Sequence, residues 1–195
     1  HAPAAERNAA PILDALRTLL PATGTVLEVA SGTGQHVATF AAALPALSFV
    51  PSDLDTSRFD SIRAWTAELG NVADPVLLDV TQTQWPVDEV DAVFCANMVH
   101  IAPPEATEGL LCGVGRHLRP GGRFMLYGPF KVQGQHTAPS NAAFDASLRA
   151  RDPRWGVRDL DVLQRRGEVL GLALREAKAM PANNMLLVFE RRPSA

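Results

Sequence analysis

Residues 26–41 read VLEVASGTGQHVATFA. An apolar run typical of a buried strand ends at Val29, small residues follow, and apolar residues then return with helical spacing. In a doubly wound sheet the first strand-to-helix turn must be small, because backbone amides approach a ligand there at the carboxyl ends of the strands. The segment 31–34 (Ser-Gly-Thr-Gly) meets that need and predicts the ligand-binding turn of an α/β fold.

Strand-like and helix-like segments alternate along most of the chain. The expected strands cover 25–29, 47–50, 75–78, 91–96 and 123–127, and the expected helices cover 10–20, 36–44, 57–69, 104–118 and 159–170. Such alternation implies right-handed crossovers and a mostly parallel sheet with helices on both faces. Two last strand-like runs, 172–177 and 185–190, are joined too closely for a crossover helix and must pair antiparallel. The predicted fold is a Rossmann-like, doubly wound α/β sheet of seven strands that ends in an antiparallel hairpin.

Composition limits the classes of function. The chain has 195 residues, of which 47% are hydrophobic and 20% charged, and this predicts a single domain over 1–195. A net charge of -3 without a basic stripe argues against a nucleic-acid partner. No run approaches the roughly 20 apolar residues of a membrane span, so we expect a soluble cytoplasmic protein, monomeric or homodimeric. Neither Cys95 and Cys112 nor the histidines have metal-ligand spacing, and no metal site is expected.

Three carboxylates indicate which kind of ligand the turn is expected to bind. Glu28 lies inside the first strand, where it would repel a phosphate and suit a cation; its alternative partner is a backbone amide. Asp53 ends the second strand and is placed to bind ribose hydroxyls, unless it only caps the next helix. Asp79 ends the third strand and could accept from the adenine amine, although Asp is also ordinary in loops. The set predicts a pocket for a positively charged nucleoside such as S-adenosylmethionine.

The chain resembles class I S-adenosylmethionine-dependent methyltransferases. The resemblance covers roughly residues 10–192 and rests on an ordered series of motifs: the glycine turn 28–34, Asp53, Asp79, the segment 91–100 and the turn 118–122. More narrowly, the chain is similar to a little-characterised group of methyltransferase-like proteins shared by bacteria and animals. That similarity rests on segments 6–8, 51–53, 127–130, 140–141, 155–159 and 180–184.

The resemblance implies S-adenosylmethionine as cofactor and S-adenosylhomocysteine as product. The implied cofactor-binding residues are Glu28, Ala30, Ser31, Gly32, Gly34, Asp53, Leu54, Asp79, Val80 and Asn97, together with Arg7 and Asn8. The last two belong to an N-terminal segment, 1–9, that is expected to fold over the cofactor as a lid. Arg7 could bind a carboxylate there, and a surface salt bridge is the alternative. Where the wider family often has a glycine, this chain has Ala30, a small obstacle to binding.

The acceptor is expected at the ends of the fourth and fifth strands, beside an insertion over 131–158. Asn97, His100 and Tyr127 are the candidate catalytic residues. Methyl transfer is a direct displacement at carbon, so alignment supplies much of the rate, and His100 is the candidate base if the acceptor carries a proton. The alternative for His100 is a hydrogen bond to the backbone. The alternative for Tyr127 is an aromatic wall with Phe130 and Trp155.

The predicted function is methyl transfer from S-adenosylmethionine to a small-molecule acceptor. Enzymes that methylate a base amino group carry an Asn- or Asp-Pro-Pro-aromatic run after the fourth strand, whereas residues 97–100 here read Asn-Met-Val-His. Two alternatives stay open. One is a non-catalytic binder of the same cofactor. The other is a nicotinamide-dependent oxidoreductase, which Glu28 disfavours, as does Val37 at the place of that fingerprint's third glycine.

Overall fold

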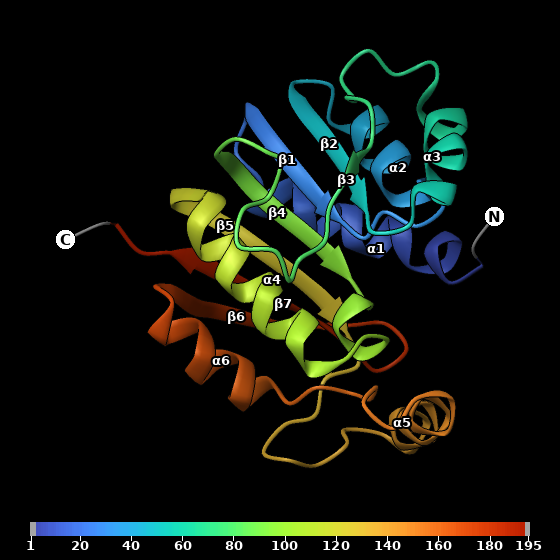
Figure 1. The fold of residues 1–195 in the computed structure, drawn as a ribbon, viewed down its shortest axis with the longest axis vertical. Helices are drawn as coiled ribbons and strands as arrows, with labels where there is room; N and C mark the ends of the chain where they lie inside the picture. The colour runs from blue at the N-terminus through green and yellow to red at the C-terminus, as the bar shows by residue number, and fades with distance from the viewer. Residues whose placement is uncertain (1–2, 194–195) are drawn as a thin grey trace.

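A seven-stranded sheet forms the centre of the protein, as a computed structural model of residues 3–193 shows (Figure 1). The strand order is β3-β2-β1-β4-β5-β7-β6. The strands are β1 (Gly24–Val29), β2 (Leu47–Asp53), β3 (Val76–Leu77), β4 (Val90–Ala96), β5 (Leu118–Gly128), β6 (Leu172–Met180) and β7 (Asn184–Arg191). β7 pairs antiparallel with β5 and with β6, and the other pairs are parallel. The predicted doubly wound sheet with a terminal hairpin is confirmed.

Helices cover both faces of the sheet (Figure 1). They are α1 (Pro3–Leu19), α2 (Gln35–Ala43), α3 (Phe59–Thr66), α4 (Pro104–His117), α5 (Pro139–Arg151) and α6 (Leu160–Val169), with short 3-10 turns η1 (Thr56–Arg58) and η2 (Met98–His100). Val26 packs with α1 and α2, whereas its neighbour Leu27 packs with α4 and α6. Successive side chains of a strand point to opposite faces, and both faces here are apolar and buried. No described helix is long and apolar enough to cross a membrane.

Helix α1 begins earlier than the sequence predicted. It was expected over 10–20, yet it starts at Pro3, so the described part of the predicted lid, 3–9, is the first half of a helix. Pro11 lies inside α1, although a proline is better tolerated in the first turn of a helix. Its missing N–H leaves the carbonyl of Arg7 without the usual intrahelical donor. Residues 1 and 2 of the predicted lid lie outside the described residues.

The insertion 131–158 contains a helix that the sequence did not predict. Helix α5 buries Asn141, Asp145 and Leu148, so its inner face is largely polar and gives no apolar periodicity. Asn141 donates from Nδ2 to the carbonyl of Asn183 at 3.0 Å, which ties α5 to the β6–β7 turn. Strand β5 also begins before the expected Arg123, and its register with β4 shifts between Val90 and Ala92.

Candidate functional site

A cavity of about 530 Å³ lies at the carboxyl ends of β1, β2 and β4. The sheet order reverses between β1 and β4, and ligands of open α/β sheets bind at such a switch point. Six of the predicted cofactor-binding residues line this cavity: Ala30, Gly32, Asp53, Leu54, Asp79 and Val80. The walls are completed by apolar residues after β3 and β4, among them Leu78, Met98, Ile101, Ala102 and Pro103.

The turn after β1 is built from residues with left-handed backbone. Ala30 has a φ of 58°, Gly32 of 57° and Gly34 of 91°. A Cβ at Gly34 would lie 2.8 Å from the Cα of Ile62, so glycine is what lets α3 pack against the start of α2. A Cβ at Gly32 would meet no atom within 4 Å. The Gly32 backbone is therefore open toward the cavity that it lines.

Asp53 links the end of β2 to this turn. Its Oδ2 accepts the Gly32 amide at 2.8 Å and its Oδ1 accepts the Asp55 amide at 3.0 Å. The residue that caps η1 is Asp55, whose side chain accepts from Ser57. Asp53 is therefore not that cap. A carboxylate has about four lone-pair sites, so Asp53 keeps acceptor capacity for a ligand in the cavity.

Asp79 also lines the cavity, and its side chain accepts most of its hydrogen bonds from its own loop. Its Oδ1 accepts from the Thr81 amide at 2.9 Å and from the Thr81 hydroxyl at 2.7 Å, and its Oδ2 accepts from Gln82 at 3.2 Å. These hydrogen bonds hold the pKa of this exposed carboxyl below its usual value. Asp79 therefore stabilises its own loop, as one interpretation of the sequence had it, and it also lines the cavity.

Glu28 lies beneath the turn, in the β1 position whose side chain faces α1 and α2. It is 4% exposed, and its Oε2 has no hydrogen-bond partner among residues 3–193. Burial raises its pKa to about 8; a Ser31 hydrogen bond opposes this rise and the charge of Asp53 adds to it. At neutral pH this carboxyl is therefore mostly protonated, and it does not line the cavity itself. Ser31 is also buried, and its hydroxyl accepts the Ser52 amide at 3.1 Å.

Asn8 joins three elements through a contact that the sequence did not reveal. The Nε2 of His36 donates to its Oδ1 at 2.6 Å, and its side chain is hydrogen-bonded to Tyr127. His36 stacks on Phe40 with ring centroids 5.5 Å apart, and burial lowers its pKa to about 4. The only sequence sign of this link was a histidine at the apolar start of α2. Arg7, by contrast, is exposed on α1.

His100 is fully buried and committed to the backbone. Its Nδ1 accepts the Arg158 amide at 3.1 Å, which places the ring proton on Nε2. Within the described part of the chain Nε2 has no hydrogen-bond partner, and a Cβ on Gly128 would lie 2.3 Å from it. Burial, with the nearby Arg158 charge, lowers the His100 pKa to about 3. The geometry matches the backbone-bonded alternative, and the base role stays a prediction.

The three candidate catalytic residues come from adjacent strand ends, but the side chains of Tyr127 and His100 pack in different core clusters. The Asn97 amide donates to the Tyr127 carbonyl at 2.9 Å, and Asn97 has a φ of 62°. The Tyr127 side chain packs with the α1–α2 cluster, while the His100 ring contacts Phe130 in the α4–α6 cluster. Phe130 and Tyr127 therefore do not share an aromatic wall. Trp155 instead stacks under Arg151, 5.0 Å from its guanidinium carbon.

Known proteins resemble the chain in sequence and in fold. A family described as "Protein of unknown function (DUF938)" matches residues 1–191. An O-methyltransferase family protein from Burkholderia thailandensis is 18% identical with a TM-score of 0.80, covering 96% of this chain and 57% of that one. The mitomycin 7-O-methyltransferase MmcR is 14% identical with a TM-score of 0.81, covering 96% and 54%.

CalO1, a methyltransferase in calicheamicin biosynthesis solved in its SAH-bound form, is 22% identical with a TM-score of 0.74, covering 95% of this chain and 54% of that one. The chain thus spans just over half the length of these solved structures. At sequence identities of 14% to 22%, the similarity to these structures shows that the fold is shared. The chain belongs to the DUF938 family, and its fold is that of class I S-adenosylmethionine-dependent methyltransferases.

Proposed function

We propose that the protein transfers the methyl group of S-adenosylmethionine to a small-molecule acceptor. The observation that carries this proposal is the charge of the cavity at the switch point. Its walls hold three carboxylates, Asp53, Asp55 and Asp79, and one cation, Arg58. An excess of negative charge suits a sulfonium nucleoside and opposes the pyrophosphate of a nicotinamide dinucleotide.

The residues present fit this cofactor. Asp53 is proposed to accept from the ribose hydroxyls and Asp79 from the adenine amine, while Leu54 and Val80 would contact the base from the apolar wall. The Oε2 of Glu28 is a buried polar atom with no partner among the described residues, a condition that costs free energy unless a ligand supplies one. Glu28 lies beneath the turn and outside the cavity lining, so we propose that the positively charged part of the ligand reaches past the turn to this oxygen.

The acceptor is proposed to bind where β4 and β5 end, beside Asn97. The bound cofactor supplies an electrophilic methyl group, so the protein's task is to align the acceptor with it and to exclude water. The Asn97 side chain is the proposed positioning group. His100 is a positioning residue in this scheme, because it accepts the Arg158 amide and its carbonyl accepts the Gly156 amide at 2.9 Å.

Thermal unfolding with S-adenosylmethionine, S-adenosylhomocysteine and NADPH in parallel tests the cofactor. A ligand that binds only the folded state raises the midpoint, by about 2.7 kcal/mol of stability at a hundredfold excess over Kd. We expect a rise with the first two ligands, a smaller one for Asp53→Asn, and an unchanged one for Asp60→Asn, an exposed acid outside the cavity. A rise with NADPH alone would overturn the charge argument.

Turnover separates an enzyme from a non-catalytic binder. Small hydroxy, amino and thiol compounds are incubated with the protein and S-adenosylmethionine, and release of S-adenosylhomocysteine is measured. Release that depends on the compound supports methyl transfer. Tight binding of both cofactor forms without release from any compound class would favour the non-catalytic alternative.

A further inference from the structure

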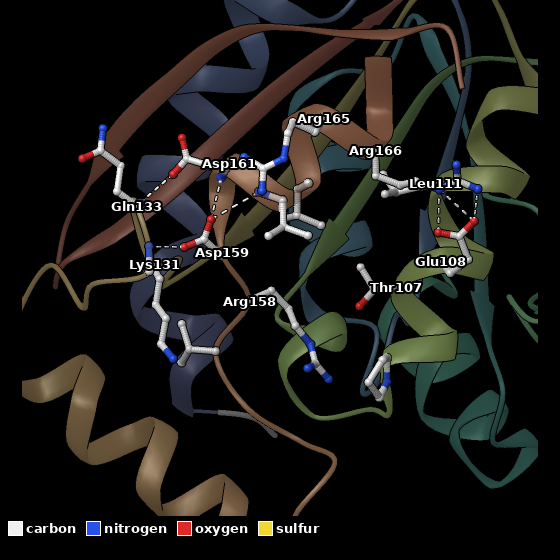
Figure 2. Close-up of a pocket in the computed structure, with 15 residues that line it drawn as sticks. Thr107, Glu108, Leu111, Lys131, Gln133, Arg158, Asp159, Asp161, Arg165 and Arg166 are labelled. Atoms are coloured by element: carbon white, nitrogen blue, oxygen red, sulfur yellow. Dashed lines mark hydrogen bonds and ion pairs between the residues drawn. The ribbon is translucent and has the colours of Figure 1, made fainter. Parts of the chain in front are cut away.

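A second cavity, of about 840 Å³, lies between α4, α6 and the segments that lead into and out of the insertion (Figure 2). Its lining residues are Pro104, Thr107, Glu108, Leu111, Lys131, Gln133, Gly134, Val157, Arg158, Asp159, Asp161, Val162, Leu163, Arg165 and Arg166. It shares no residue with the switch-point cavity. The start of α4 separates the two: Pro103 and Ala106 line one, Pro104 and Thr107 the other.

The rim of this second cavity is fixed by hydrogen bonds. Asp159 caps α6 by accepting the Asp161 amide at 2.9 Å, and its other oxygen accepts the Gly134 amide at 2.5 Å. Asp161 accepts the Gln133 amide at 2.5 Å (Figure 2). The loop of the insertion is therefore fastened to the first turn of α6, and the cavity is preformed. Preformed, largely apolar cavities of this size are typical of small-molecule sites.

The carboxylates of the second cavity are all engaged within the protein. Asp159 and Asp161 accept the backbone amides just described. Glu108 forms a forked ion pair with Arg166, whose Nε lies 2.8 Å and 3.0 Å from its two oxygens (Figure 2). This geometry satisfies both partners at once. Each acid of the cavity lining is thus held by a partner within the protein, and Arg166 neutralises Glu108.

The lining of the second cavity, in contrast, holds more basic than acidic side chains. Lys131 lies 3.6 Å from Asp145, but that carboxylate also pairs with Arg149 at 3.2 Å. Arg158 donates from Nε to the Val99 carbonyl at 2.8 Å and from Nη2 to two further carbonyls, bonds that leave Nη1 available. Burial lowers the pKa of Arg158, and the nearby Arg149 charge lowers it further. Arg165 takes part in none of the ion pairs found among residues 3–193.

The remaining lining offers apolar contact and one unused polar atom. The apolar residues are Pro104, Leu111, Val157, Val162 and Leu163. The Oγ1 of Thr107 is buried and has no hydrogen-bond partner among the described residues. A buried hydroxyl without a hydrogen-bond partner is unusual in a folded protein, and a ligand with an acceptor atom would supply that partner.

We propose that the cavity between α4 and α6 binds a small amphipathic organic anion, with an apolar body against Leu111, Val162 and Leu163 and a carboxylate facing Arg165. The site is independent of the methyl-transfer cavity. Its ligand is therefore a second small molecule, not the methyl donor.

Calorimetric titration with 2-naphthoate tests this site, with the neutral 2-naphthamide as its isosteric control. We expect the carboxylate to bind at least tenfold more tightly than the amide, and Arg165→Gln to remove most of that preference. Equal affinity for the two compounds would overturn the proposed anion selectivity.

A matched pair of substitutions on α6 locates the binding. Val162 lines the cavity and is 54% exposed, so Val162→Trp fills the space from its rim without disturbing the core. Val169 is 74% exposed on the same helix and does not line the cavity, which makes Val169→Trp the control. We expect a loss of 2-naphthoate affinity of at least tenfold for Val162→Trp only. Equal affinities in the two variants would place the ligand elsewhere.

The midpoint rise with S-adenosylmethionine separates this proposal from the proposed function. Val162→Trp should keep that rise, because Val162 does not line the switch-point cavity. The 2-naphthoate affinity should be the same with and without S-adenosylmethionine. Competition between the two ligands would contradict the independence of the second site.

Discussion

At the scale of single residues, Ala30 carries a conformational strain that glycine would remove. Its φ of 58° lies in the left-handed region, which costs an L-residue about 1–2 kcal/mol. Glycine relieves that strain but loses about 0.5–1 kcal/mol more chain entropy on folding. We therefore expect Ala30→Gly to raise the free energy of unfolding by about 0.5–1 kcal/mol, measured by urea denaturation.

Ala42 provides the control for that substitution. It is exposed in the last turn of α2, where its backbone is helical. Ala42→Gly should lower the free energy of unfolding by up to about 1 kcal/mol, because glycine is a poor helix former. If both substitutions destabilise the protein equally, Ala30 is not strained.

Glu28 makes stability depend on pH. Its pKa in the folded protein, about 8, lies above the value of 4.5 for an unburied glutamate. The unfolded chain therefore releases this proton first as pH rises, so stability is highest below about pH 4.5 and falls until about pH 8. The slope from this group is at most about 1.4 kcal/mol per pH unit.

Glu28→Gln removes the titrating group and keeps the side chain's shape. We expect the free energy of unfolding of the variant, relative to the wild type, to increase between pH 5 and pH 8 by a few kcal/mol. Urea denaturation at several pH values measures the difference. Two parallel curves would mean that Glu28 is ionised in the folded protein.

At the scale of elements, Asp159 is expected to hold both α6 and the loop of the insertion. Asp159→Ala removes the cap of α6 and the acceptor of the Gly134 amide, so the free energy of unfolding should fall by about 1–2 kcal/mol. Asp159→Asn retains an acceptor oxygen and should lose clearly less. Urea denaturation of both variants checks this, and equal losses would mean that charge, not capping, is what matters.

The elements that the sequence predicted are those with apolar periodicity. Strands β1 and β4 were predicted because their side chains are apolar on both faces, and α6 because Asp159 precedes an apolar stripe. Helix α5 was missed because two of its three buried residues, Asn141 and Asp145, are polar. The start of α1 was missed because Pro11 marks a helix start more often than a helix interior.

At the scale of the whole molecule, topology decided which parts of the site could be predicted. Parallel strands end at one edge of a sheet, so Gly32, Asp53 and Asp79 were expected together, and they line one cavity. The cavity between α4 and α6 was not expected. It depends on the packing of segments far apart in the sequence, held by hydrogen bonds such as that from the Gln133 amide to the Asp161 carboxylate, 28 residues away. The burial of His100 depends equally on such long-range packing.

The proposed cofactor and the buried acid together predict that binding releases a proton. At pH 7 the Glu28 carboxyl is mostly protonated, because its pKa is about 8. A cation bound beside it favours the ionised form and lowers that pKa, so about one proton should leave for each S-adenosylmethionine bound. Above about pH 9 the carboxyl is already ionised and the release should vanish.

Titration calorimetry in buffers with different ionisation enthalpies counts these protons. Glu28→Gln should bind S-adenosylmethionine without releasing a proton at pH 7, since its amide does not titrate. A release that persists in this variant would assign the proton to another group. Binding by the wild type without any release at pH 7 would mean that the ligand's charge does not reach Glu28, and the role proposed for its unpaired oxygen would be wrong.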